Sequence, residues 1–144
     1  MSVVVSACLL GRACRYDGRH SRNDQLKNDL VGESVVPVCP EELGGLGTPR
    51  PAAELTGGDG SGVWDGTARV VLVESGLDVT REFCDGAQAT LHAARQTGAH
   101  RAILKEGSPS CGTGRIQLDG NKVVGQGVSA ALLARHGISV EARS

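Results

Sequence analysis

The chain has 144 residues, a formal net charge of -1 and a hydrophobic fraction of 40%, values typical of one globular domain. Aromatic residues make up only 2% of the chain and no basic run is present, so nucleic-acid binding is not expected. No apolar stretch is long enough to span a membrane or to serve as a secretion signal. We therefore expect a single cytoplasmic domain over residues 1–144.

The first part of the chain predicts two strands, one helix and a long loop. Val3–Ala7 and Ser34–Val38 are short runs rich in valine, which is typical of buried strands in a parallel sheet. Between them, leucines four residues apart predict a short helix over Arg22–Leu30. Pro40–Gly62 is rich in glycine and proline, and loops of this length are usually functional or mobile.

The rest of the chain continues the alternation of strands and helices. Val63–Thr67 and Arg69–Val73 are predicted strands around Asp65-Gly66, a dipeptide that favours hairpin turns. Apolar residues with helical spacing predict a helix over Thr80–Thr97, which Gly98 ends. The remaining predicted elements are a strand over His100–Leu104, a hairpin over Ile116–Val124, a helix over Val128–His136 and a strand over Ile138–Val140.

The alternating pattern predicts the α/β fold class. We expect a single Rossmann-like domain with a mainly parallel sheet and helices on both faces. Neither a glycine-rich dinucleotide fingerprint nor a Walker motif follows any predicted strand. The sequence therefore gives no support for a nucleotide cofactor.

Three of the five cysteines follow predicted strands directly or by a short turn. Because the carboxyl ends of parallel strands meet at one edge of a sheet, we expect Cys8, Cys39 and Cys111 to converge. Three thiolates in a reducing compartment suit zinc or an iron–sulfur cluster, and the spacing does not decide between them. The alternative is that each cysteine is a small buried hydrophobic residue.

Several other polar residues lie near these cysteines in the sequence. Cys84 falls inside a predicted helix and is expected in the core, whereas Cys14 fits a fourth ligand, a redox-active thiol or a bystander. Glu41 and Glu42 follow the second strand-end cysteine, where a carboxylate either handles protons or remains a surface charge. Arg50, between two prolines, either orients an anionic or carbonyl group or is exposed to solvent.

Short motifs along the chain resemble those of one known family. They are SACLLG with CRYDG, then PVCPE with GGL and TPRP, and finally SPSCG, in this order. Together they resemble the 4Fe–4S-dependent thiouracil desulfidase family, long catalogued as a domain of unknown function. The match runs from Val4 to about Val140, which is nearly the whole chain.

The resemblance implies a fold, a cofactor and an activity. It implies a Rossmann-like domain with a 4Fe–4S cluster held by Cys8, Cys39 and Cys111, whose fourth iron is free to bind sulfur. It also implies that Glu41 and Ser108 are catalytic. The implied enzyme removes sulfur from a small-molecule thiolated pyrimidine, converting thiouracil to uracil plus sulfide without net electron transfer.

Two other functions remain compatible with the sequence. One is a zinc-binding or iron–sulfur-binding module without catalysis. The other is a sulfurtransferase that works through a persulfide on Cys14 or Cys111. The sequence leaves open the oligomeric state and whether the substrate is a base, a nucleotide or tRNA.

Overall fold

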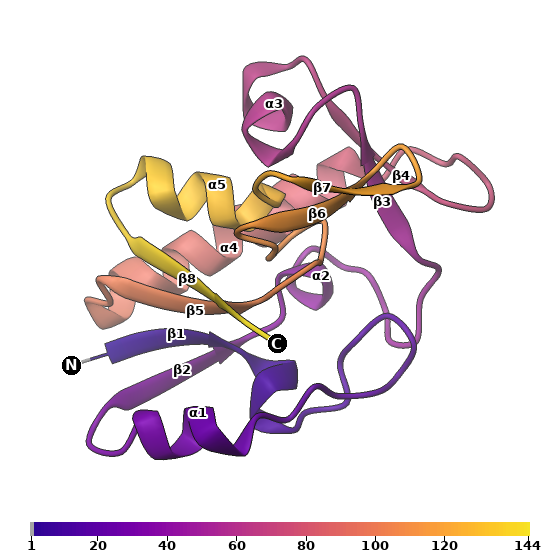
Figure 1. Ribbon diagram of the computed structural model, residues 1–144. Coiled ribbons are helices and arrows are strands. Elements are labelled where there is room, and N and C mark those ends of the chain that lie inside the picture. The colour runs from indigo at the N-terminus through magenta and orange to yellow at the C-terminus, as the bar shows by residue number, and fades with distance from the viewer. Residues whose placement is uncertain (1) are drawn as a thin grey trace.

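The computed structural model describes residues 2–144, apart from the side chains of Arg115 and Gln117. Its centre is a four-stranded parallel sheet, here called sheet A (Figure 1). In spatial order, sheet A consists of β2 (Ser34–Val38), β1 (Ser2–Ser6), β5 (Arg101–Lys105) and β8 (Ser139–Arg143). These strands lie where the sequence predicted them, to within a few residues, so the mixed α/β class with a mainly parallel sheet is confirmed.

Helices cover both faces of sheet A (Figure 1). They are α1 (Asp24–Asp29) on one face, and α4 (Thr80–Thr97) with α5 (Val128–Arg135) on the other. Successive strand residues point to opposite faces. Val3 and Val5 accordingly pack with Leu26 of α1, whereas Val4 belongs to the larger core with Phe83 of α4.

The longest helix matches its predicted boundaries. α4 begins at Thr80 and ends where Gly98 adopts a left-handed conformation, with φ of 70°. Its buried apolar residues recur every three to four positions, which places them on one face toward sheet A; they include Phe83, Ala87, Leu91 and Ala94. Within the described part of the chain, no helix is both long and apolar enough to cross a membrane.

A second four-stranded sheet, sheet B, was not predicted as a unit. In spatial order it consists of β4 (Arg69–Leu72), β3 (Ala53–Thr56), β6 (Arg115–Leu118) and β7 (Asn121–Val124). Only the β3–β6 pair is parallel. The hairpin formed by β6 and β7 was predicted correctly, but its pairing with β3 joins segments that are far apart in sequence.

The prediction of one long loop over Pro40–Gly62 is wrong. This stretch contains α2 (Pro40–Leu43), β3 and the start of α3 (Gly60–Asp65). The predicted strand over Val63–Thr67 is also wrong, because the Asp59 side chain caps α3 by accepting a hydrogen bond from the Gly62 N–H. Asp65-Gly66 therefore ends a helix instead of forming a hairpin turn.

Two glycines let α2 lie directly against the backbone of α4. A Cβ atom added to Gly86 of α4 would lie 1.9 Å from the carbonyl oxygen of Pro40. A Cβ atom added to Gly44, at the end of α2, would lie 1.9 Å from the carbonyl oxygen of Glu82. Since no side chain fits at either position, the glycines fix the place of α2, which carries Glu41.

We expect Gly86→Ala to lower the free energy of unfolding by about 1–3 kcal/mol, because the new methyl group forces α2 away from α4. This expected loss is the net value, after the gain of about 1 kcal/mol from the higher helix propensity of alanine. Gly47→Ala is the control, since a Cβ there meets no atom within 4 Å. Urea denaturation measures both variants, and equal midpoints would contradict the close approach.

Candidate metal and catalytic site

The residues predicted to form the site all line one cavity. It has a volume of about 710 Å³ and lies at the carboxyl ends of β1, β2 and β5. Cys8, Cys39, Cys111, Glu41 and Ser108 are among its lining residues. The expected convergence of the three strand-end cysteines is therefore present in the structure. Cys84, in contrast, packs against the core from α4, as predicted.

The first cysteine is held by a tight turn after β1. Cys8 lies in a short 3-10 helix, η1 (Ala7–Leu10), which ends at Gly11 with φ of 102°. The carbonyl oxygen of Cys8 accepts hydrogen bonds from the N–H of Gly11 at 3.2 Å and from that of Ser21 at 2.9 Å. These two hydrogen bonds hold both ends of the loop between Gly11 and Ser21 close to the end of β1.

The loop after β5 carries Ser108 and Cys111 and is ordered by its own polar groups. Ser108 Oγ accepts hydrogen bonds from the N–H groups of Ser110 and Cys111, both at 3.0 Å. The Glu106 carboxylate accepts from the N–H groups of Gly107 and Thr113, both at 3.1 Å. The loop therefore presents its thiol and hydroxyl from a fixed backbone.

Glu41 is held by a mostly buried ion pair with Arg50. Both Nε and Nη2 of Arg50 donate to Glu41 Oε2, and the two side chains are 7% and 14% exposed. Arg50 also donates to the carbonyl oxygen of Cys14 at 3.0 Å and to Thr48 Oγ1 at 2.9 Å. Of the two interpretations of Arg50 from the sequence, the one in which it orients an anionic group is confirmed, and that group is Glu41.

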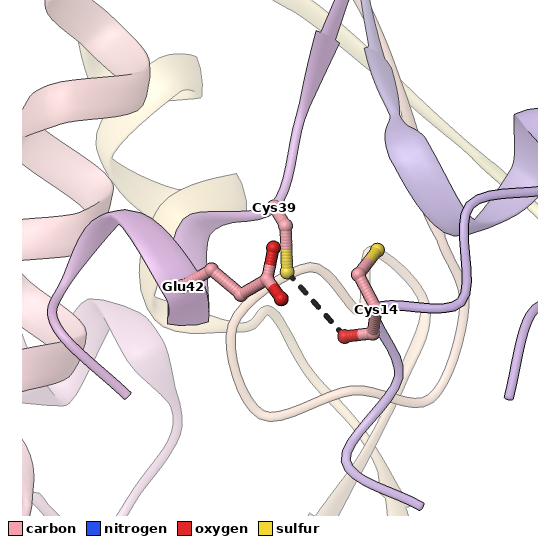
Figure 2. A group of neighbouring side chains, drawn as sticks. All are labelled: Cys14, Cys39 and Glu42. Atoms are coloured by element: carbon pink, nitrogen blue, oxygen red, sulfur yellow. Dashed lines mark hydrogen bonds between the residues drawn. The ribbon is translucent and has the colours of Figure 1, made fainter. Parts of the chain in front are cut away.

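Cys14 lies inside the site. The sequence had left its role open. Its thiol is buried and shares a hydrophobic cluster with Cys8 and Cys39. The Cys39 thiol donates a weak hydrogen bond to the Cys14 carbonyl oxygen, with an S···O distance of 3.6 Å (Figure 2). Ligand atoms of Cys14, Cys39 and Glu42 all lie within 4.8 Å of one another. The sequence predicted neither this grouping nor the part of Glu42 in it.

The cavity thiols differ in acidity. A hydrogen bond with Cys14 lowers the pKa of Cys8 and outweighs the opposing effect of burial. A hydrogen bond with Cys14, together with burial, raises the pKa of Cys39. Burial raises the pKa of Cys111 to about 12. Because metals bind thiolates, a metal that binds here must displace protons from the less acidic thiols.

The donor chemistry of the cavity fits an iron–sulfur cluster. Such clusters are held by cysteine thiolates, and Cys8, Cys39 and Cys111 offer three sulfur atoms from three separate segments around one space. All five cysteines of the chain are free thiols, so none of these sulfurs is used in a disulfide.

Comparison with known proteins places the chain in a family. A family model described as 2-thiouracil desulfurase matches residues 3–144. The chain belongs to the 2-thiouracil desulfurase family. The resemblance inferred from the sequence motifs is thereby confirmed.

Two known proteins are similar to this chain over almost their whole length. The uncharacterized protein YbbK of Bacillus subtilis (strain 168) is 45% identical over 141 residues, which are 96% of this chain and 93% of YbbK. The solved structure of the [4Fe-4S]-dependent thiouracil desulfidase TudS is 44% identical, with a TM-score of 0.82. The similarity covers 99% of this chain and 90% of TudS.

We expect Arg50→Met to lower the free energy of unfolding by about 3 kcal/mol, because it leaves the buried Glu41 carboxylate without its partner. Arg50→Lys keeps the charge but not the forked geometry, so its loss should be smaller. Arg12→Met is the control: Arg12 pairs with Glu42 but is 63% exposed, and its loss should stay below about 1 kcal/mol. Equal denaturation midpoints for Arg50→Met and Arg12→Met would contradict the importance of the buried pair.

Proposed function

We propose that this protein is a non-redox, 4Fe–4S-dependent desulfidase that converts thiouracil to uracil and sulfide. The observation that carries the proposal is the convergence of three cysteine thiols, a held carboxylate and a serine hydroxyl on one cavity. The 44% identity to TudS, whose name states [4Fe-4S]-dependent thiouracil desulfidase, supports it. The overall reaction is hydrolytic: thiouracil and water give uracil and hydrogen sulfide, and no electrons are gained or lost.

In this proposal Cys8, Cys39 and Cys111 hold the cluster. When bound, the cluster supplies a Lewis-acidic iron that takes soft sulfur and polarises the thiocarbonyl carbon. Cys14 is left out of the proposed ligand set, in line with the three-cysteine set implied by the sequence motifs. Its thiol instead donates the hydrogen bond that increases the acidity of Cys8.

Glu41 is the proposed proton acceptor. Its place at the start of α2, two residues after Cys39, puts the carboxylate on the cavity wall. Arg50 holds it through Oε2. Oε1 then remains to accept a proton from the attacking water, or to pass one to the ring nitrogen or the departing sulfur.

Ser108 is proposed to donate a hydrogen bond to the substrate. Its oxygen already accepts two backbone N–H groups, which use the acceptor capacity of a hydroxyl. The O–H hydrogen is what remains, so the side chain acts as a donor into the cavity. A thiocarbonyl or carbonyl group of the pyrimidine, or the attacking water, is a suitable acceptor.

An apolar wall faces these polar groups and suits a flat ring. Leu46 lines the cavity from the segment after α2, Leu72 from sheet B, and Val79 and Phe83 from the start of α4 and the residue before it. Ligand cavities combine such apolar surface with a few placed polar groups. We propose that the pyrimidine ring packs against this wall while its sulfur faces the cysteines.

We also propose that residues 1–144 form a single Rossmann-like domain that works in the cytoplasm. The parallel order of sheet A with helices on both faces supports the fold. The five free thiols support a reducing compartment.

The test of the proposed function is anaerobic cluster reconstitution followed by a sulfide-release assay over several thiolated pyrimidines. We expect equal amounts of uracil and sulfide from thiouracil, in proportion to the iron content. Undiminished activity after iron removal would favour the persulfide mechanism and overturn the proposal. No sulfide release from fully loaded protein would favour a non-catalytic cluster module.

We expect each of Cys8→Ser, Cys39→Ser and Cys111→Ser to abolish cluster assembly, because each removes one of the three proposed iron ligands. Cys84→Ser is the matched control, since that thiol packs against the core. Cys14→Ser should also retain the cluster. Iron and sulfide analysis after anaerobic reconstitution measures the cluster content of each variant. Parental iron content in Cys39→Ser would overturn the ligand assignment.

We expect Glu41→Gln to keep the cluster and substrate binding while turnover falls by about 10²–10⁴-fold, the usual effect of removing a positioned acid–base group. The amide retains the shape and still accepts hydrogen bonds from Arg50, but it does not accept a proton. Glu42→Gln, the neighbouring carboxylate on α2, should have a much smaller effect. Thiouracil turnover at the parental rate in iron-quantified Glu41→Gln would remove Glu41 from the mechanism.

A further inference from the structure

A second group of ligand atoms lies beside the proposed cluster residues. The thiols of Cys14 and Cys39 and a carboxylate oxygen of Glu42 all lie within 4.8 Å of one another. Figure 2 shows the three side chains, which come from the loop after η1 and from the start of α2. We propose that the protein without its cluster binds one thiophilic divalent cation of the zinc class at these three residues.

The donor set selects the class of cation. Two sulfur ligands and one oxygen ligand suit zinc, whereas magnesium and calcium take oxygen ligands alone. A tetrahedral zinc with bonds of about 2.3 Å places its sulfur ligands about 3.8 Å apart. The three atoms already lie within 4.8 Å, so small side-chain rotations complete the site.

One oxygen of the Glu42 carboxylate makes an ion pair but no hydrogen bond. The other oxygen accepts a hydrogen bond from Thr48 Oγ1, which fixes the side chain. The first, Oε1, is buried and accepts no hydrogen bond, although Arg12 Nη2 lies 3.0 Å away. The Arg12 side chain is 63% exposed and can turn into solvent when a cation arrives. A bound cation would replace the Arg12 guanidinium as the charged partner of this oxygen.

Sharing of Cys39 makes the cation and the cluster mutually exclusive. Cys14 and Glu42 belong only to the cation site, and Cys111 only to the cluster site. The cation therefore protects or blocks the cysteines of the cluster-free protein until a cluster replaces it. This consequence, unlike the cation site itself, rests on the proposed function.

Zinc competition against a chromophoric chelator tests the cation site in the full-length chain, stripped of metal under anaerobic conditions. We expect one zinc ion per chain, with the affinity reduced at least about tenfold in Cys14→Ser and in Glu42→Gln. Cys111→Ser and Glu41→Gln are matched controls that should keep the parental affinity. Circular dichroism checks folding, and Glu42→Gln keeps the test decisive if Cys14→Ser does not fold.

Two results would overturn the cation site. One is parental zinc affinity in Glu42→Gln, or in Cys14→Ser if that variant folds. The other is a loss in Cys111→Ser as large as in Cys14→Ser, which would place the cation among the proposed cluster ligands.

Zinc added before reconstitution tests the exclusion separately. It should slow iron incorporation in the parent protein and much less in Cys14→Ser. Equal slowing in both would overturn the exclusion. If the parent protein takes up no iron at all, the proposed function fails while the zinc affinities still decide the cation site.

Discussion

The mostly buried ion pair between Arg50 and Glu41 is the interaction on which the site depends. Burial of a charge without a partner costs several kcal/mol, so each side chain requires the other to remain where it is. The same guanidinium binds the carbonyl oxygen of Cys14 and the hydroxyl of Thr48. It thereby ties the loop after η1 and the segment after α2 to the start of α2. Much of the cavity wall lies outside helices and strands. The ion pair holds these segments in fixed positions relative to one another.

Sheet A and two glycines bring that pair to the thiols. The carboxyl ends of β1, β2 and β5 lie at one edge of a parallel sheet, so the cysteines that follow them meet there. Gly44 and Gly86 then let α2 pack directly on α4. Thiols, a fixed carboxylate and an apolar wall consequently face one cavity. This combination suits a substrate with a soft sulfur atom on a flat ring.

The sequence predicted what local patterns determine and missed what tertiary contacts determine. The strands of sheet A follow from short apolar runs, of which those of β1 and β2 are rich in valine, and the helix α4 follows from helical spacing. The convergence of Cys8, Cys39 and Cys111 follows from their strand ends. β3 is only four residues long and pairs with β6 through Leu55 and Leu118, a contact without any local signal. Asp59 did carry a local capping signal for α3, which the nearby Asp-Gly dipeptide obscured. The place of Cys14 depends on Arg50, far along the chain, so its neighbours were not predictable.

Anomalous diffraction at the iron edge, from anaerobic crystals of the reconstituted protein, tests the central claim most directly. We expect one iron cluster in the cavity, bonded to the sulfur atoms of Cys8, Cys39 and Cys111. Cys14 should remain unbonded, and after a thiouracil soak the sulfur of the ligand should lie at the iron that has no protein ligand. A cluster bonded to Cys14, or iron outside the cavity, would contradict the account.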